Sequence, residues 1–211
     1  MNIYNVIILD ESGSMSSIYR ETLSSVNEVL NGIRRNQEEF PQQRHYVTIV
    51  TFEGEGMRGI KMRRDRVPVE GIQPFAPKDY RPGGCTPLYD AMGKTLSNLE
   101  GLIRPEDKVM ATVITDGMEN SSQEYSGRAV KKLVSRLRGK GWALAYIGAN
   151  QDSVEVARDL NIGNALNFEA SPEGMEEMSF RLVDASLRMS RMADEKKDLG
   201  SCNDLFSPGT E

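Results

Sequence analysis

The chain has 211 residues, 38% of them hydrophobic, and a formal net charge of −5. An acidic chain lacks the basic face that a dedicated nucleic-acid-binding protein needs, so we expect no nucleic-acid partner. The local basic group of Lys61, Arg63, Arg64 and Arg66 is interpreted as a solvated edge hairpin. The single histidine, His45, excludes sites built from several histidine ligands, which are typical of zinc enzymes.

Cysteine content and hydropathy are used to predict the cellular location of the protein. The two cysteines, Cys85 and Cys202, are too few for a disulfide framework and fit a reducing environment. No apolar run reaches the length of about 18 residues that a transmembrane helix needs. No basic stretch precedes the apolar run at residues 3–9, so we expect no signal peptide, no membrane association and a cytoplasmic protein.

Strand-like and helix-like patterns alternate along the chain. Apolar, β-rich runs predict strands at residues 3–9, 46–52, 109–114, 142–147 and 165–168, with a hairpin arm at 57–62. Apolar stripes at helical spacing predict helices over about 19–35, 87–99, 126–137, 154–160 and 171–194. We expect Thr86 to cap the second helix, with Pro87 at its first position, and Ser126 to cap the third.

This alternation predicts an α/β fold with a mostly parallel sheet and helices on both faces. We expect one domain over residues 1–169 and an additional helix within 170–195 that packs on it. The polar tail, residues 196–211, is predicted to be mobile or to dock only through Leu205 and Phe206.

Polar side chains gather where strands of the predicted sheet end. In an open α/β sheet, ligands bind beyond the carboxyl ends of the strands. The oxygen-bearing residues at these ends, or at the following helix start, are Asp10, Ser12, Ser14, Thr86 and Asp116. Side chains at alternate positions of an extended loop point the same way, so the first three can converge. Two carboxylates and three hydroxyls suit a hard cation, Mg²⁺ or Mn²⁺.

These residues resemble the motif of a known family. Residues 10–14, with the sequence DESGS, are similar to the DxSxS motif of von Willebrand factor type A (vWA) domains. Thr86 resembles the motif's distant threonine, and Asp116 its late aspartate. The resemblance covers residues 2–168. It implies a three-layer, Rossmann-like fold with one antiparallel edge strand, which residues 57–62 would supply.

The resemblance also implies a function. It implies a metal-ion-dependent adhesion site (MIDAS) in which Ser12, Ser14 and Thr86 ligate the metal directly or nearly so. Asp10 and Asp116 then act directly or through water, and an open position accepts a carboxylate from a protein partner. The chain resembles stand-alone cytosolic bacterial members more than extracellular ones, and the partners of these members are often proteins of a stress-response or ATPase-linked system; this step is analogy alone. We expect specificity to come from the loops at residues 53–56, 78–84 and 118–121.

An enzymatic function is the alternative. A phosphoryl-transfer enzyme or phosphoreceiver-like domain could use Asp10 and Asp116 to hold magnesium. It would need a phosphoacceptor aspartate after a middle strand, where Glu53 stands, and a lysine after the fifth strand, where residues 148–150 supply none. A serine hydrolase would need a base near the site and a G-x-S-x-G turn. We therefore expect a binding module without catalytic activity.

Four neighbours of the predicted site are interpreted as structural. Glu11 is expected to be a solvated acid, with a role as an acceptor behind the site as the alternative. Asp90 is expected to complement the dipole of the helix after Pro87, and Asn120 to serve as a loop or cap residue. Cys85 is expected to be a small buried residue, with redox sensitivity as the alternative.

Overall fold

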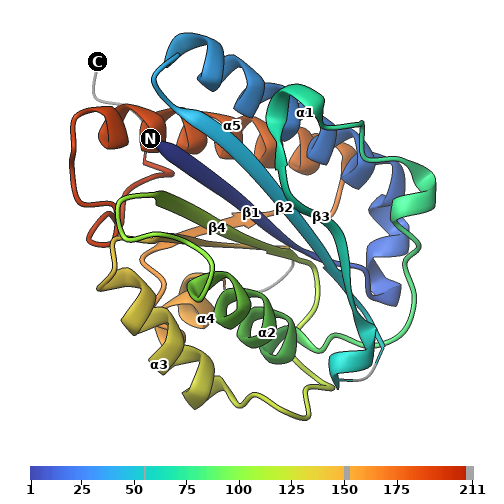
Figure 1. The fold of residues 1–211 in the computed structure, drawn as a ribbon. Helices are drawn as coiled ribbons and strands as arrows, with labels where there is room; N and C mark the ends of the chain where they lie inside the picture. Colours follow the sequence, from blue (N-terminus) through green and yellow to red (C-terminus); the bar gives the residue numbers. More distant parts are fainter. Residues whose placement is uncertain (55, 150–152, 208–211) are drawn as a thin grey trace.

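The computed structural model describes residues 1–54, 56–149 and 153–207. Its centre is a six-stranded sheet with strand order β3-β2-β1-β4-β5-β6 (Figure 1). The strands are β1 (Asn2–Asp10), β2 (Arg44–Phe52), β3 (Ile60–Pro68), β4 (Lys108–Thr115), β5 (Ala143–Ala149) and β6 (Asn164–Phe168). Neighbouring strands are parallel except for β2 and β3, which are antiparallel. The predicted sheet with one antiparallel edge strand is confirmed.

Helices cover both faces of this sheet (Figure 1). One face carries α1 (Tyr19–Glu39) and α5 (Pro172–Asp194); the other carries α2 (Leu88–Glu100), α3 (Gly127–Arg138) and α4 (Ser153–Asp159). The core divides in the same way, because successive side chains of a strand point to opposite faces. In β1, Ile7 and Leu9 pack on the α1 side, whereas Val6 and Ile8 pack on the α2 side. The three-layer arrangement is therefore also confirmed.

Of the two expected helix N-caps, one is confirmed and one is wrong. The Ser126 hydroxyl accepts a hydrogen bond from the Ala129 N–H and caps α3 as expected. The predicted cap at Thr86 is wrong: α2 begins at Leu88, and the N-cap position is Pro87, which makes no side-chain cap hydrogen bond. Side chains from another loop take over that task, as described below.

The edge strand differs from its prediction. Residues 56–59 form a short 3₁₀ turn, η2 (Gly56–Gly59), and β3 runs from Ile60 to Pro68 rather than over 57–62. The apolar pattern that identified the other strands is missing from β3, because an edge strand can carry charged residues and needs no continuous apolar stretch. Its register is irregular: Arg64 pairs with Ile49 and Met62 pairs with the next residue, Val50. Arg63 is therefore an extra residue at a β-bulge, a feature that re-aims a side chain.

The C-terminal segment packs on the α1 side. Gly32 of α1 allows a close approach, since a Cβ there would lie 2.8 Å from the Val183 side chain of α5. After α5 the chain returns along the core and buries Leu199, Cys202 and Leu205, while most of the other residues in 196–207 are exposed. The predicted mobility of this segment stays a prediction. The rest of the predicted tail, residues 208–211, lies outside the described residues. Within the described part, no helix is both long enough and apolar enough to cross a membrane.

Candidate metal centre

Asp10 is the last residue of β1, and its carboxylate is completely buried, at 0% exposure. One oxygen, Oδ1, accepts a hydrogen bond from the Ser12 N–H at 2.7 Å. The other, Oδ2, accepts one from the Thr115 hydroxyl at 2.5 Å. Thr115 ends the neighbouring strand β4, so two adjacent parallel strands fix the direction of this carboxylate.

The two serines approach Asp116 from the opposite loop. Ser12 Oγ lies 3.2 Å from Ser14 Oγ, and the Ser14 hydroxyl donates to Asp116 Oδ1 at 2.6 Å. The expected extended loop is not found, because a 3₁₀ helix, η1 (Gly13–Ile18), begins between the serines. The tight turn brings the side chains together instead. Ser14 is exposed and Ser12 is buried, so this group reaches from the interior to the surface.

Thr86 completes the set from a third loop. Its N–H donates to Asn120 Oδ1 at 2.8 Å, and the Asn120 N–H donates back to the Thr86 carbonyl at 3.2 Å. Asn120 therefore holds Thr86 in place, as the loop residue it was expected to be. A Cβ built on Gly117 would lie 3.0 Å from Thr86 Oγ1 and 3.6 Å from Asp10 Oδ2. The structure thus brings Thr86 Oγ1 and Asp10 Oδ2 next to Gly117, which directly follows Asp116, while Ser14 contacts both Asp116 and Ser12.

The electrostatics of this set fit a cation. Burial raises the pKa of Asp10 to about 6 and also raises the pKa of Asp116. Within the described residues, neither carboxylate forms an ion pair with a basic side chain. A hard divalent cation would supply the missing positive charge and accept the hydroxyl oxygens as neutral ligands. The donor chemistry therefore fits Mg²⁺ or Mn²⁺.

The set differs from a carboxylate-rich metal centre. Among the described residues, no cluster of three or more His, Cys, Asp or Glu side chains is arranged to hold a metal ion. The candidate site has only two carboxylates, so any affinity depends on the three hydroxyls. The Ser12 and Ser14 hydroxyls contact each other and Asp116, whereas Thr86 is held through its backbone by Asn120.

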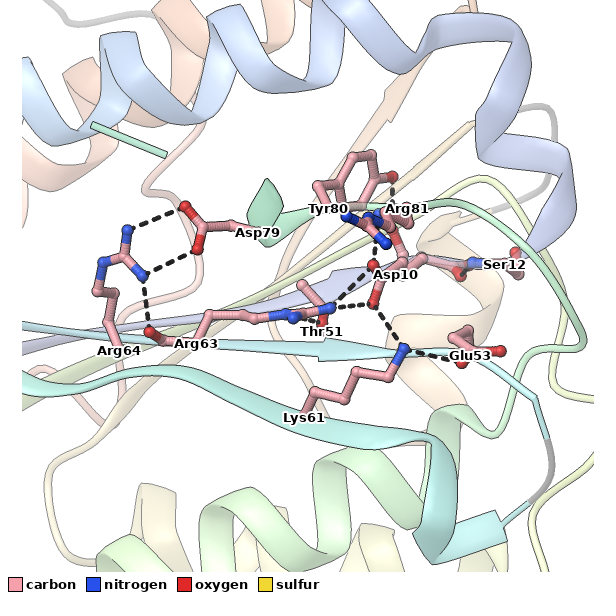
Figure 2. A network of polar contacts seen from close by, with 11 residues as sticks. Asp10, Ser12, Thr51, Glu53, Lys61, Arg63, Arg64, Asp79, Tyr80 and Arg81 are labelled. Carbon is pink, nitrogen blue, oxygen red and sulfur yellow. Dashed lines mark hydrogen bonds and ion pairs between the residues drawn. The ribbon is translucent and has the colours of Figure 1, made fainter. Parts of the chain in front are cut away.

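Glu11 is not the solvated acid that was expected. It is fully buried, at 0% exposure, and both carboxylate oxygens accept hydrogen bonds from Arg63 Nη2 at 2.9 Å. The basic residues of β3 are accordingly engaged with acids rather than free in solvent: Arg64 pairs with Asp79 at 3.1 Å (Figure 2). The position of Glu11 beside Asp10 was visible in the sequence, but its basic partner, Arg63, lies 52 residues away.

Asp90 and Glu119 interlock two loops behind Thr86. Asp90 accepts hydrogen bonds from the backbone N–H groups of residues 123, 124 and 125 at 2.7–2.9 Å, so it does more than complement a helix dipole. Glu119 accepts the Tyr89 N–H at 2.9 Å and thereby caps the start of α2. This contact explains why Thr86 does not need to cap the helix.

Cys85 is exposed, so the expectation that it is a small buried residue is wrong. The alternative, redox sensitivity, stays a prediction. The exposed residue lies next to Thr86 in the chain.

Comparisons with known proteins identify the fold. No protein-family profile and no curated protein sequence matches this chain. Solved structures do match it. A von Willebrand factor type A protein from Catenulispora acidiphila is similar at 14% identity and a TM-score of 0.59, with 88% of this chain and 43% of that chain covered. The pilus adhesin SpaC from Lactobacillus rhamnosus GG, in an open conformation, matches at 12% identity and a TM-score of 0.67, over 89% and 30%.

A third similar structure contains a metal. Proximal thread matrix protein 1 from the mussel byssus, with a zinc-occupied MIDAS motif, matches at 14% identity and a TM-score of 0.59, over 88% of this chain and 46% of that chain. The chain spans less than half the length of each of these three structures. At such low identities the likeness establishes the fold alone. The chain has the von Willebrand factor type A fold, with an oxygen-rich cluster at the carboxyl ends of its strands.

Proposed function

We propose that the chain binds a divalent cation, Mg²⁺ or Mn²⁺, through Asp10, Ser12, Ser14, Thr86 and Asp116. The observation that supports this most strongly is the convergence of two carboxylates and three hydroxyls from three loops, with no basic partner for either carboxylate among the described residues. Asp10 and Asp116 would balance the charge of the ion. The hydroxyls would supply neutral oxygen ligands.

We further propose that this site captures an acidic side chain of a protein partner. A bound hard cation supplies a position that takes another oxygen ligand. The surroundings support a macromolecular ligand: Met118, two residues after Asp116, is 70% exposed, and Cys85 and Asn120 are exposed as well. The similar structures named above include an adhesin and a matrix protein.

Specificity would come from the surrounding loops. Residues 78–84 and 118–121 border the candidate centre, as does the loop at 53–56, of which residue 55 lies outside the described residues. A protein of an ATPase-linked or stress-response system remains the proposed class of partner, on analogy alone. Two free cysteines support a cytoplasmic place of action.

A binding role without catalysis is the simplest proposal for this geometry. His45, the one histidine, is the second residue of β2 and lies at the end of the sheet opposite Asp10. Thus the site has no imidazole base for its serines. The phosphoryl-transfer alternative makes a different prediction, since it implies either covalent labelling by acetyl phosphate or turnover of a generic phosphate ester. Residue 150, where a receiver-like lysine was sought, lies outside the described residues and is asparagine.

A pull-down experiment tests the proposal. The wild-type chain is used as bait with Mg²⁺, with EDTA, and in the variant Asp116→Asn, which keeps the shape of the side chain. We expect a partner that is retained only by the wild type with metal. Alanine replacement of single acidic residues in that partner should then abolish capture at one position. Capture that survives both EDTA and the variant would contradict the proposal, and acetyl phosphate labelling would favour the alternative.

A further inference from the structure

Glu11 carries a charge that the candidate metal centre does not use directly. Its buried carboxylate receives both Arg63 hydrogen bonds and one from the Arg81 N–H, which reaches Oε1 at 2.5 Å. The Lys61 ammonium lies 3.6 Å from Oε2. A buried ion pair adds little net stability, because the desolvation of both charges offsets their attraction. A role in fixing local geometry explains the cluster better.

Arg63 is aimed at Glu11 by the irregular edge strand. It occupies the β-bulge between Arg64 and Met62, and its Nε–H donates to the Thr51 hydroxyl of β2 at 2.8 Å. Figure 2 shows Arg63 and Lys61 extending from β3 toward the chain that follows Asp10. Lys61 is also paired with Glu53 at 2.9 Å. The bulge therefore directs the Arg63 side chain toward Glu11, in the loop that also carries Ser12 and Ser14.

Three further hydrogen bonds join the same two loops. The Tyr80 hydroxyl donates to the Asp10 carbonyl at 2.8 Å, and burial raises the pKa of this phenol, so it stays a donor. The Gly83 N–H donates to the Glu11 carbonyl at 2.9 Å, and the Gly13 N–H donates to the Gly84 carbonyl at 3.1 Å. The segment of residues 80–84 is thus fastened along residues 10–13, and Thr86 follows two residues later.

We propose that Glu11 is a positioning residue of the metal centre. Its carboxylate fastens segment 80–84 to the loop after β1 and so fixes Thr86 relative to Asp10 and the two serines. Arg63 extends this link to the edge strand β3. The proposal rests on the proposed cation site, because it assigns Glu11 the task of holding that site together.

The variant Glu11→Gln tests this role with two measurements. Glutamine offers one acceptor oxygen where glutamate offers two, and its NH₂ group opposes the Arg63 guanidinium. In the metal-free protein, we expect the amides of Gly13, Arg81 and Gly83 to exchange with solvent about tenfold faster than in the wild type. Mn²⁺ affinity, measured by electron paramagnetic resonance, should fall by about tenfold.

Glu100 offers a matched control. Its carboxylate accepts hydrogen bonds from Arg136 at 2.9 and 2.8 Å and lies 2.8 Å from Lys140, so it too pairs with one arginine and one lysine. It stands at the far end of α2, roughly 20 Å from Thr86. We expect Glu100→Gln to change neither the exchange of the three amides nor the Mn²⁺ affinity.

A second variant guards against misfolding. If Glu11→Gln does not fold, the double variant Glu11→Gln/Arg63→Met removes both charges together, which a buried pair tolerates better than the loss of one. It should show the same faster exchange and weaker affinity. Wild-type exchange in either variant, or faster exchange with unchanged affinity, would overturn the proposal. If the wild type itself takes up no Mn²⁺, the cation site is wrong, and the exchange measurement still decides whether Glu11 fastens the two loops.

Discussion

The Ser14 hydroxyl donates a 2.6 Å hydrogen bond to Asp116 Oδ1 and so joins loops that are 102 residues apart in the sequence. This contact lies at the exposed side of the cluster, whereas the bond between Thr115 and Asp10 lies at its buried side. The candidate metal centre is therefore held from both sides before any ion arrives. Preorganisation of this kind lowers the cost of binding, because the ligands need little reordering.

Ser14→Ala should weaken cation binding with little effect on the metal-free fold. The variant removes one neutral oxygen ligand and the bond to Asp116, and the side chain is exposed. We expect about tenfold weaker Mn²⁺ binding by calorimetry, equivalent to about 1.4 kcal/mol. Ser16→Ala, in the same 3₁₀ helix and also exposed, is the control and should bind as the wild type does.

Gly117→Ala should fill the space at the centre of the cluster. The new Cβ would lie 3.0 Å from Thr86 Oγ1 and 3.6 Å from Asp10 Oδ2, where the ligand oxygens converge. We expect Mn²⁺ affinity to fall at least about tenfold while the far-ultraviolet circular dichroism spectrum is retained. Gly101→Ala is the control, because its Cβ would meet no atom closer than 3.8 Å. Equal affinities in the two variants would place the ion elsewhere.

Cation binding should depend on pH through Asp10. Burial raises the pKa of this carboxyl from 3.8 to about 6, so protons compete with the cation below that pH. We expect Mg²⁺ affinity to fall by about tenfold for each pH unit below 6, as measured by calorimetry. The stability of the metal-free fold depends on pH in the opposite direction. The folded state holds the proton of Asp10 more tightly than the unfolded chain does, so the contribution of Asp10 to the free energy of unfolding decreases as pH rises from about 4 to 6.

His45 should make the fold sensitive to acid. It is fully buried, its Nδ1 lies 3.3 Å from the Asn5 amide, and its Nε2 has no partner among the described residues. Burial lowers its pKa from 6.5 to about 4. The unfolded chain therefore binds the proton first, and stability decreases by up to about 3 kcal/mol as pH falls from 6.5 to 4.

Asp10 and His45 act in opposite directions over this pH range, so variants are needed to separate them. Urea unfolding of Asp10→Asn should expose a clear loss of stability in acid. The variant His45→Gln should lose that acid sensitivity. If both variants show the same pH profile as the wild type, the two assignments are wrong.

Asp90→Asn should destabilise the fold without touching the ligands. The carboxylate is buried and serves three backbone N–H groups, and asparagine would turn an NH₂ group toward some of them. We expect a loss of about 2–3 kcal/mol in the free energy of unfolding, measured in urea. Asp65→Asn removes an exposed carboxylate paired with Arg66 and should cost much less. Comparable losses in the two variants would contradict the assigned role of Asp90.

The sequence revealed the parts of the fold that have strong periodicity. Buried parallel strands such as β1 and β4 are continuous apolar runs, and long amphipathic helices such as α5 show their stripe, so both were predictable. The edge strand β3 was misplaced because its charged residues pair with Glu11, Glu53 and Asp79, which lie between 8 and 52 residues from their partners in the sequence. Local patterns of apolar and polar residues do not predict ion pairs between different segments of the chain.

In the candidate site as well, some residues could be predicted from the sequence and others could not. Asp10, Ser12, Ser14, Thr86 and Asp116 could be selected because each follows a strand or precedes a helix. The residues that hold them could not. Thr115 and Tyr80 act through single hydrogen bonds to Asp10, and Glu119 caps a helix that begins 31 residues earlier. These roles depend on loop conformations that a local pattern does not encode.

Direct measurement of Mn²⁺ uptake tests whether Asp10 and Asp116 hold a cation. Electron paramagnetic resonance titrations would compare the wild type with the double variant Asp10→Asn/Asp116→Asn, which keeps the side-chain shapes and removes both charges. We expect one bound Mn²⁺ in the wild type, displaced by Mg²⁺, and no bound ion in the variant. A wild-type chain that binds no Mn²⁺, or a variant that binds it equally well, would show that these two carboxylates do not form a cation site.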